Sequence, residues 1–167
     1  MCSSDLLTIL TAARTGEVVG ATWDEIKDDV WTIPAERMKG GKEHRVPLSA
    51  PALRILDHQR RFRENEFVFP GRLRKGMSPA TMLALLWRMD CDFTVHGFRS
   101  SFRDWAAETT NYANHVVEMA LAHVVGSRVE AAYRRGDLFE KRRRLMHTWA
   151  EYLARPAATG EVVPLRR

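Results

Sequence analysis

The spacing of apolar side chains predicts helices through most of the second half of the chain. Residues 6–13 are apolar and indicate an element that begins almost at the first residue. The pair Ser78-Pro79 combines a capping residue with a first-turn proline and predicts a helix over residues 81–89. Further helices are predicted over residues 17–23, 50–63 (capped by Ser49), 96–108, 115–122, 128–135 and 137–153.

Two segments of β-type residues lie in the first half. Residues 30–33 and 44–48 favour strands, and the Gly-rich stretch 39–42 between them is typical of a turn. Together they predict a hairpin with a basic tip, to which residues 67–69 add a short strand. The predicted class is therefore α+β, mostly α-helical, with a small antiparallel β-hairpin or three-stranded sheet.

The length and composition fit one globular domain. The chain has 167 residues, of which 45% are apolar. No apolar run approaches the roughly 20 residues of a membrane span, and the start has no signal-peptide pattern. Two cysteines are too few for a disulfide framework, so a reducing cytoplasm is expected. We expect a domain over residues 1–156 and a loosely ordered tail over 157–167.

Positive charge is concentrated in two blocks. Residues 37–75 carry a net charge of +7 and residues 134–167 a net charge of +5, whereas residues 1–36 carry −5 and residues 76–133 carry −2. This distribution suggests a surface that meets a polyanion on selected faces. Charge alone fits solvated helix faces equally well.

Two motifs in the first half carry candidate chemistry. Arg14 stands three positions before Glu17, and a guanidinium forms paired hydrogen bonds with the oxygens of a phosphate. One helical turn on, Glu17 would hold that guanidinium in place, although a surface ion pair would show the same spacing. In the predicted hairpin, Lys39 and Lys42 flank two glycines ahead of a Val-Pro-Leu-Ser strand. A Gly-rich turn with solvent-exposed lysines fits this composition equally well.

Two further motifs follow in the second half. The spacing of His96 and Arg99 places both side chains on one face of a helix start, where they can converge on a single phosphate. His123 precedes Tyr133 by ten residues. The other tyrosines, Tyr112 and Tyr152, lack a partner at that spacing and are expected to be packing residues with a solvated hydroxyl. Taken singly, His123 and Tyr133 also fit core packing.

These four stretches, in this order, resemble the active-site boxes of tyrosine recombinases, especially those of the phage-integrase branch. They span residues 13–135, and the helix predicted over 137–153 is also similar to that branch. The resemblance implies a catalytic-domain fold built as a helical bundle. It implies these catalytic residues: Arg14, Lys39, His96, Arg99, His123 and Tyr133. Glu17 would support Arg14, and Lys42, Arg45 and Arg103 are expected to bind DNA.

The resemblance also implies the chemistry. Tyr133 would attack phosphorus and form a 3′-phosphotyrosine, while Lys39, at the position of the family's hairpin lysine, would protonate the leaving 5′ oxygen. The phosphodiester energy stays in the covalent link, so neither a nucleotide cofactor nor a metal is expected. The implied partners are double-stranded DNA and further copies of the full-length protein, which would form a tetramer on DNA. Family members carry more chain before the first arginine, so we expect this chain to lack an N-terminal part.

Three alternatives remain at this point. The chain would be a non-catalytic DNA-binding remnant if truncation has removed its activity. A type IB topoisomerase uses a similar site, but the Val-Pro-Leu-Ser strand and the final helix favour an integrase. A metal nuclease is the weakest alternative, because the six histidines show no paired ligand spacing apart from their positions in the recombinase boxes.

Overall fold

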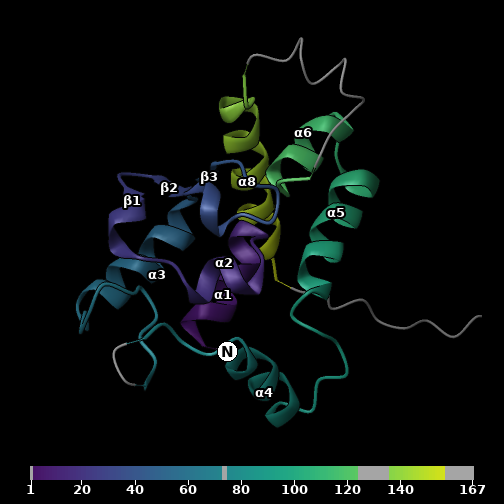
Figure 1. Ribbon diagram of the computed structural model, residues 1–167. Coiled ribbons are helices and arrows are strands. Elements are labelled where there is room, and N and C mark those ends of the chain that lie inside the picture. The colour runs from purple at the N-terminus through teal and green to yellow at the C-terminus, as the bar shows by residue number, and fades with distance from the viewer. Residues whose placement is uncertain (1, 73–74, 124–135, 157–167) are drawn as a thin grey trace, which may run out of the picture.

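A small sheet lies on one side of the molecule and helices form the rest of it (Figure 1). The computed structural model describes residues 2–72, 75–123 and 136–156. In these ranges the α-helices are α1 (Ser3–Thr11), α2 (Thr15–Val19), α3 (Ala50–Arg60), α4 (Ala80–Arg88), α5 (Gly97–Thr109), α6 (Asn114–Ala120) and α8 (Phe139–Leu153). Two 3₁₀ turns are η1 (Trp23–Glu25) and η2 (Ala35–Arg37).

The sheet contains three antiparallel strands in the order β1 (Ile26–Lys27), β2 (Val30–Ile33) and β3 (His44–Pro47). Val30 pairs with Pro47 and Ile33 with His44, which confirms the predicted hairpin. The prediction of a strand over residues 67–69 is wrong. Phe67 forms only an isolated bridge with Thr22. Glu66 and Val68 bond to Trp23 and Ala21, but the carbonyl of Phe69 already bonds to Met77, so no ladder develops.

Two groups of buried apolar side chains meet at α1. The first joins the sheet, α1, α3 and α4, and contains Leu7 and Leu10 of α1. The second joins α5, α6 and α8 and contains Phe102 and Trp149, whose ring centroids lie 5.4 Å apart. The indole nitrogen of Trp149 also donates a hydrogen bond of 2.8 Å to the carbonyl of Ile9 in α1. Helix α1 therefore ties the sheet side of the molecule to the helical side.

Most predicted helices are confirmed within two or three residues at each end. The helix expected over 17–23 is shorter, because α2 ends at Val19 and Trp23 opens η1 instead. Ser49 occupies the position before α3, but its Oγ forms no hydrogen bond with the described residues. The helix predicted over 128–135 and the tail 157–167 lie outside the described residues. In the part of the chain that the structure describes, no helix is long and apolar enough to cross a membrane.

Candidate active site

Arg99 is a buried cation where the ends of α1 and α6 meet α5. Its side chain projects from the first turns of α5, and the residue is 5% exposed. The guanidinium donates hydrogen bonds to the carbonyl of Ala12 and, at 2.7 Å, to that of Leu121. Its Nη2 also lies 3.3 Å from Nε2 of His123. The structure therefore brings Arg99 and His123 together from positions 24 residues apart.

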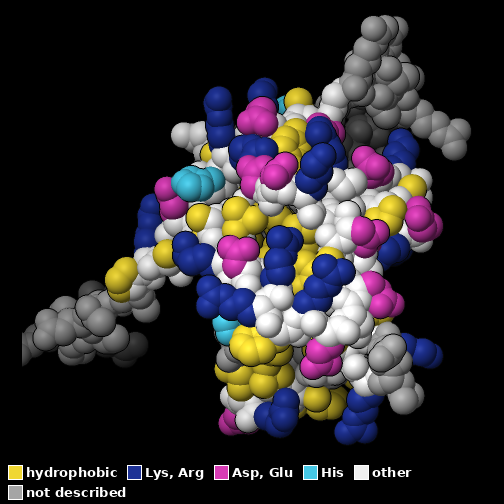
Figure 2. All heavy atoms as spheres, turned by 90° about the vertical axis from the view of Figure 1, so that its left-hand side faces the viewer, with side chains coloured by type: hydrophobic (Ala, Val, Ile, Leu, Met, Phe, Trp, Pro, Cys, Tyr) yellow, Lys and Arg dark blue, Asp and Glu magenta, His cyan; other side chains and the backbone are white. Residues whose placement is uncertain are grey.

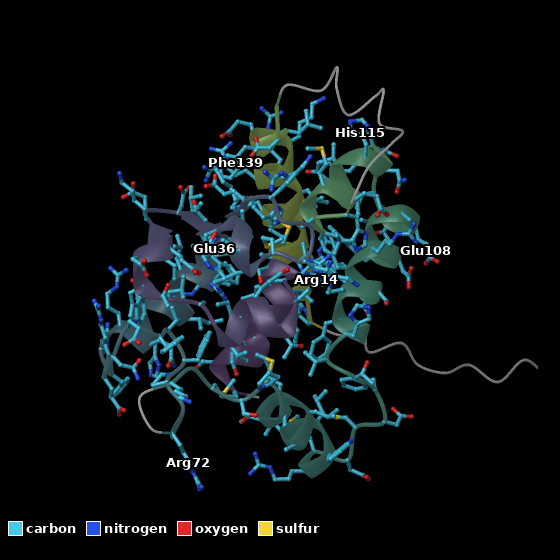
Figure 3. The ribbon with its side chains drawn as sticks, in the orientation of Figure 1. Arg14, Glu36, Arg72, Glu108, His115 and Phe139 are labelled. Carbon is cyan, nitrogen blue, oxygen red and sulfur yellow. The ribbon has the colours of Figure 1, made fainter. Side chains whose placement is uncertain are left out.

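Arg14 lies in the middle of the molecule, between the α1–α2 pair and α5 (Figure 3). It directly precedes α2, and its Nη1 donates a 2.7 Å hydrogen bond to Oε1 of Glu17. The second carboxylate oxygen of Glu17 accepts a 2.7 Å bond from the backbone N–H of Arg14. Glu17 is 4% exposed, so a buried carboxylate fixes both the start of the helix and the guanidinium. This is the contact that their spacing predicts.

The charges around Arg99 come from one further guanidinium, that of Arg14, and from the carboxylates of Glu17 and Glu118. Burial, followed by the nearby charge of Arg14, lowers the pKa of Arg99 to about 10. Arg99 is still a cation at neutral pH. Near the same region, burial and the charge of Arg142 lower the pKa of His44 to about 4, so His44 is neutral at physiological pH.

His123 is held by a residue that the sequence did not single out. Its Nδ1 lies 2.7 Å from Oε2 of Glu118 in α6. The other carboxylate oxygen, Oε1, accepts a 2.7 Å hydrogen bond from Nε of Arg103 in α5. Glu118 stands five positions before His123 and belongs to none of the sequence motifs noted above. The two side chains come together only when the end of α6 has folded.

The remaining predicted residues lie around this cluster. His96 is exposed at the start of α5, one turn before Arg99. Lys39 and Lys42 are exposed between η2 and β3, and neither forms a hydrogen bond or ion pair with another predicted site residue that the structure describes. Tyr133, the predicted nucleophile, lies outside the described residues.

Arg45, predicted to bind DNA, is bonded to Asp137 in this structure. Its Nε and Nη2 lie 3.0 and 2.8 Å from Oδ2 of that carboxylate. Arg142 donates a 2.7 Å bond to the same oxygen and a 2.5 Å bond to the carbonyl of Arg45, and it is only 1% exposed. Asp137 lies two residues beyond the range 124–135, so this network ties the chain that follows that range to strand β3. DNA binding by Arg45 remains a prediction.

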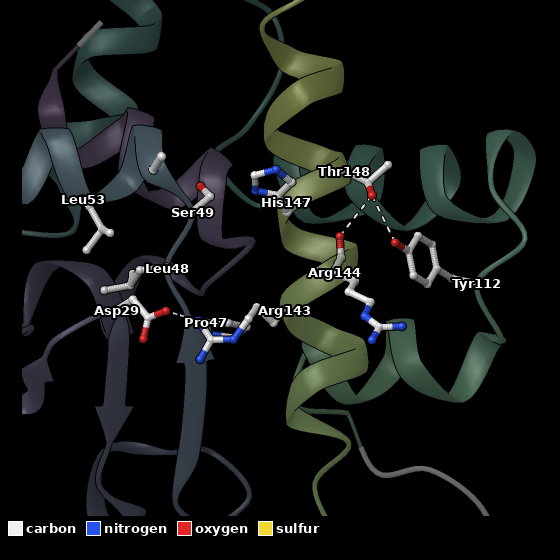
Figure 4. A pocket seen from close by; sticks show the side chains of 11 residues that line it. Asp29, Pro47, Leu48, Ser49, Leu53, Tyr112, Arg143, Arg144, His147 and Thr148 are labelled. Carbon is white, nitrogen blue, oxygen red and sulfur yellow. Dashed lines mark hydrogen bonds and ion pairs between the residues drawn. The ribbon is translucent and has the colours of Figure 1, made fainter.

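A pocket with a volume of about 600 Å³ lies elsewhere, between α8, the end of β3 and the start of α3 (Figure 4). Arg143 forms an ion pair with Asp29 at its edge, and the hydroxyl of Tyr112 lies 3.0 Å from Oγ1 of Thr148. None of the described residues predicted for the active site lines it.

The face at the left of Figure 1 shows basic and acidic side chains interspersed, with no continuous basic stripe (Figure 2). Among the described residues, no three His, Cys, Asp or Glu side chains form a candidate metal site.

Comparison with solved structures identifies the class of fold. The integrase of mycobacterium phage Brujita superposes with a TM-score of 0.69 at 17% identity, over 93% of this chain and 53% of that one. The catalytic core of lambda integrase superposes with a TM-score of 0.56 at 21% identity, over 75% of this chain and 81% of that core. The fold is therefore that of an integrase catalytic domain, and the predicted fold class is confirmed.

Sequence comparison identifies the family. Residues 5–138 match the phage integrase family, and the chain belongs to that family, as the four motifs predicted. Prophage integrase IntA of Escherichia coli K12 is 38% identical over 162 residues, which cover 93% of this chain and 39% of that protein. The integrase of Enterobacteria phage P4 is 33% identical, over 88% of this chain and 38% of that protein. The chain thus spans about two fifths of the length of these relatives.

Proposed function

We propose that this chain is the catalytic domain of a tyrosine recombinase that integrates or recombines DNA at specific sites. It would cleave and rejoin DNA strands through a covalent 3′-phosphotyrosine. The observation that carries this proposal is the buried guanidinium of Arg99, which is held against His123 and lies within electrostatic range of Arg14. Membership of the phage integrase family supports it.

Arg14, Arg99 and His123 would hold the scissile phosphate. Negative charge builds on the non-bridging oxygens as phosphorus becomes five-coordinate, and fixed cations stabilise that charge without having to reorganise. Glu17 and the carbonyls of Ala12 and Leu121 keep the two guanidiniums in place before DNA arrives. The site would therefore bind the transition state more tightly than the ground state.

The strand would be cut by transfer of the phosphoryl group to Tyr133. The bond from the phenol oxygen to phosphorus forms as the bond from phosphorus to the 5′ oxygen breaks. Lys39 would donate a proton to that leaving oxygen, while His96 accepts the phenol proton or orients the phosphate. Attack by the 5′ hydroxyl of a second strand reverses the step. Because the phosphodiester energy is kept in the covalent link, the reaction consumes no cofactor.

Double-stranded DNA is the proposed partner, and self-association on DNA is proposed for the protein that contains this chain. Structures of lambda integrase include a dimer bound to a core site and a tetramer bound to a Holliday junction. We propose the same kind of assembly for this protein, with the bacterial cytoplasm as its place of action.

The proposal is tested with a nicked DNA substrate whose cleavage releases a short fragment and traps the enzyme. A recombinase forms a protein–DNA adduct that survives denaturant, whereas a DNA-binding module forms none. The substrate carries the protein's own recombination site, and the assay is run with this chain and with the longer protein. Absence of the adduct in both would overturn the proposed function.

The two hairpin lysines are expected to behave differently. Replacing Lys39 with alanine should slow cleavage by about 10²–10⁴-fold, since a general acid is lost. Replacing Lys42 should mainly weaken DNA binding, which makes it the matched control. A substrate with sulfur at the 5′ bridging position has a leaving group that needs no proton, so it should restore cleavage by Lys39→Ala. Failure of that rescue would show that Lys39 is not the general acid.

DNA binding by this chain alone is expected to be weak and steeply dependent on salt. The chain spans about two fifths of its relatives' length, so it should supply only part of their DNA contacts. The logarithm of the affinity should fall linearly with the logarithm of the salt concentration, with a slope of about −0.9 for each phosphate contacted. Fluorescence anisotropy over a salt series measures this slope. Nanomolar, sequence-specific binding at physiological salt would contradict the prediction.

A further inference from the structure

Glu118 links two ionisable side chains beside the candidate site, those of His123 and Arg103. Only 15% of its side chain is exposed, and both carboxylate oxygens accept hydrogen bonds of 2.7 Å, from His123 and from Arg103. Its backbone also contributes, because its carbonyl accepts a 2.9 Å bond from the amide of His123. His123 is therefore fixed to the same residue through both its main chain and its ring.

The contact with Glu118 determines which imidazole nitrogen faces the site. A carboxylate only accepts hydrogen bonds, so Nδ1 of His123 must carry the proton that it donates. The second ring nitrogen, Nε2, then points towards Nη2 of Arg99, at 3.3 Å. In the neutral ring this nitrogen is an acceptor for Arg99, and in the protonated ring it is a donor available to a phosphate oxygen.

The carboxylate of Glu118 is charged when it makes these contacts. Burial would raise its pKa, but the hydrogen bonds from Arg103 and His123 outweigh burial and lower the pKa below its ordinary value. Arg103 occupies the second oxygen and so limits rotation of the carboxylate, although its own side chain is 54% exposed. A charged and doubly held carboxylate stabilises an imidazolium as well as orienting the neutral ring.

We propose that Glu118 is a positioning residue that acts through His123. It would aim Nε2 of His123 at the scissile phosphate, and Arg103 would hold the carboxylate in the required orientation. The proposal rests on the proposed function only where it names phosphate as the target. The orientation of the ring by Glu118 is a property of the protein without DNA and is tested separately.

The first test is nitrogen NMR of the ¹⁵N-labelled chain without DNA, at a pH where imidazole is neutral. His123 should be protonated at Nδ1 in the native protein. Glu118→Ala removes the shorter of the two contacts that favour the Nδ1–H form and leaves only the 3.3 Å contact with Arg99, so the ring should shift towards the Nε2–H form that free imidazole favours. Glu118→Gln keeps the shape of the side chain and an acceptor, so the ring should stay protonated at Nδ1, but its Nδ1–H proton should move upfield because the hydrogen bond is no longer to a charge.

The exposed pair of His147 and Glu151 in α8 provides a matched control. Its atoms lie 3.3 Å apart, and the two side chains are 64% and 59% exposed. Glu151→Ala removes the same kind of contact away from the site and should leave the signals of His123 unchanged. An unaltered tautomer in Glu118→Ala would overturn the proposal. If that variant does not fold, an unaltered Nδ1–H resonance in Glu118→Gln would overturn it instead.

The second test is the rate of adduct formation at saturating DNA. Glu118→Ala should lower this rate by at least about tenfold with little change in DNA affinity, because a charge-assisted hydrogen bond to a catalytic side chain is lost. Glu118→Gln should recover part of the rate. If Glu118→Ala shifts the tautomer but forms adduct at the native rate, the positioning role in catalysis is wrong. If the native protein forms no adduct while the tautomer shifts as expected, the proposed function fails and the orientation of His123 by Glu118 stands.

Discussion

Replacing Tyr133 with phenylalanine is expected to abolish covalent attachment to DNA while leaving DNA binding unchanged. The substitution removes one oxygen and almost no volume. A phenol is a weak nucleophile at neutral pH, so catalysis depends on placing it in line with phosphorus next to cations. Without its oxygen no other group can form the phosphotyrosine. The adduct is measured on a denaturing gel after incubation with a nicked substrate, and binding is measured on an intact one.

Two other tyrosines are the controls for this experiment. The hydroxyl of Tyr112 lies 3.0 Å from that of Thr148, and the ring of Tyr152 stacks on Trp149 with centroids 5.6 Å apart. Both contacts are structural, so Tyr112→Phe and Tyr152→Phe should still form the adduct. Adduct formation by Tyr133→Phe at the native rate would show that another residue is the nucleophile.

Replacing Arg99 with lysine is expected to lower the rate of cleavage by about 10²–10³-fold or more, the usual effect of losing one preorganised donor in a transition state. Lysine keeps the positive charge but presents a single nitrogen. It cannot bond to the carbonyls of Ala12 and Leu121 and also reach a phosphate with the geometry of a guanidinium. The rate is measured under single-turnover conditions with DNA in excess of its dissociation constant.

Arg88→Lys on α4 is the matched control, because Arg88 is exposed and lies outside the site. Thermal unfolding of both variants separates loss of catalysis from loss of structure, since Arg99 is buried and its hydrogen bonds join the ends of α1 and α6. A folded Arg99→Lys protein that cleaves at nearly the native rate would contradict the role assigned to Arg99.

The helices that pack on one another could be predicted from the sequence because their apolar residues recur at helical spacing. Phe102 and Trp105 of α5 and Leu145 of α8 are all buried in this way. The β2–β3 hairpin could also be predicted, since its strands are close in sequence and are joined by a Gly-rich turn. Local pattern and turn chemistry determine these elements.

There is a physical reason why the third strand of the sheet, β1, could not be predicted. Strand β1 has only two residues, Ile26 and Lys27, and such a short segment has no recognisable alternation. The residues with the stronger β-type pattern, 67–69, form one isolated bridge, and their backbone bonds to Ala21 through Val68 and to Met77 through Phe69. Strand formation here depends on which neighbours the tertiary structure supplies.

Only part of the candidate site could be predicted from the sequence. The sequence motifs predicted Arg14, Arg99 and His123 as site residues, but not the groups that orient them. The carbonyl of Ala12 reaches Arg99 only after the end of α1 has met α5, and the carboxylate of Glu118 reaches His123 only once the end of α6 has folded. The bond from Arg45 to Asp137 likewise joins residues 92 positions apart. Contacts of this kind depend on the packing of the chain and leave no local signal.

The most direct measurement is identification of the residue that carries DNA after cleavage. The adduct is formed with native protein, extended to the length of its relatives if this chain alone is inactive, and is digested with protease and nuclease. Mass spectrometry then locates the remaining phosphonucleotide. We expect it on the peptide that contains Tyr133, attached through the phenol oxygen. A phosphonucleotide on Tyr112, Tyr152 or a serine would contradict the assignment of Tyr133 as the nucleophile.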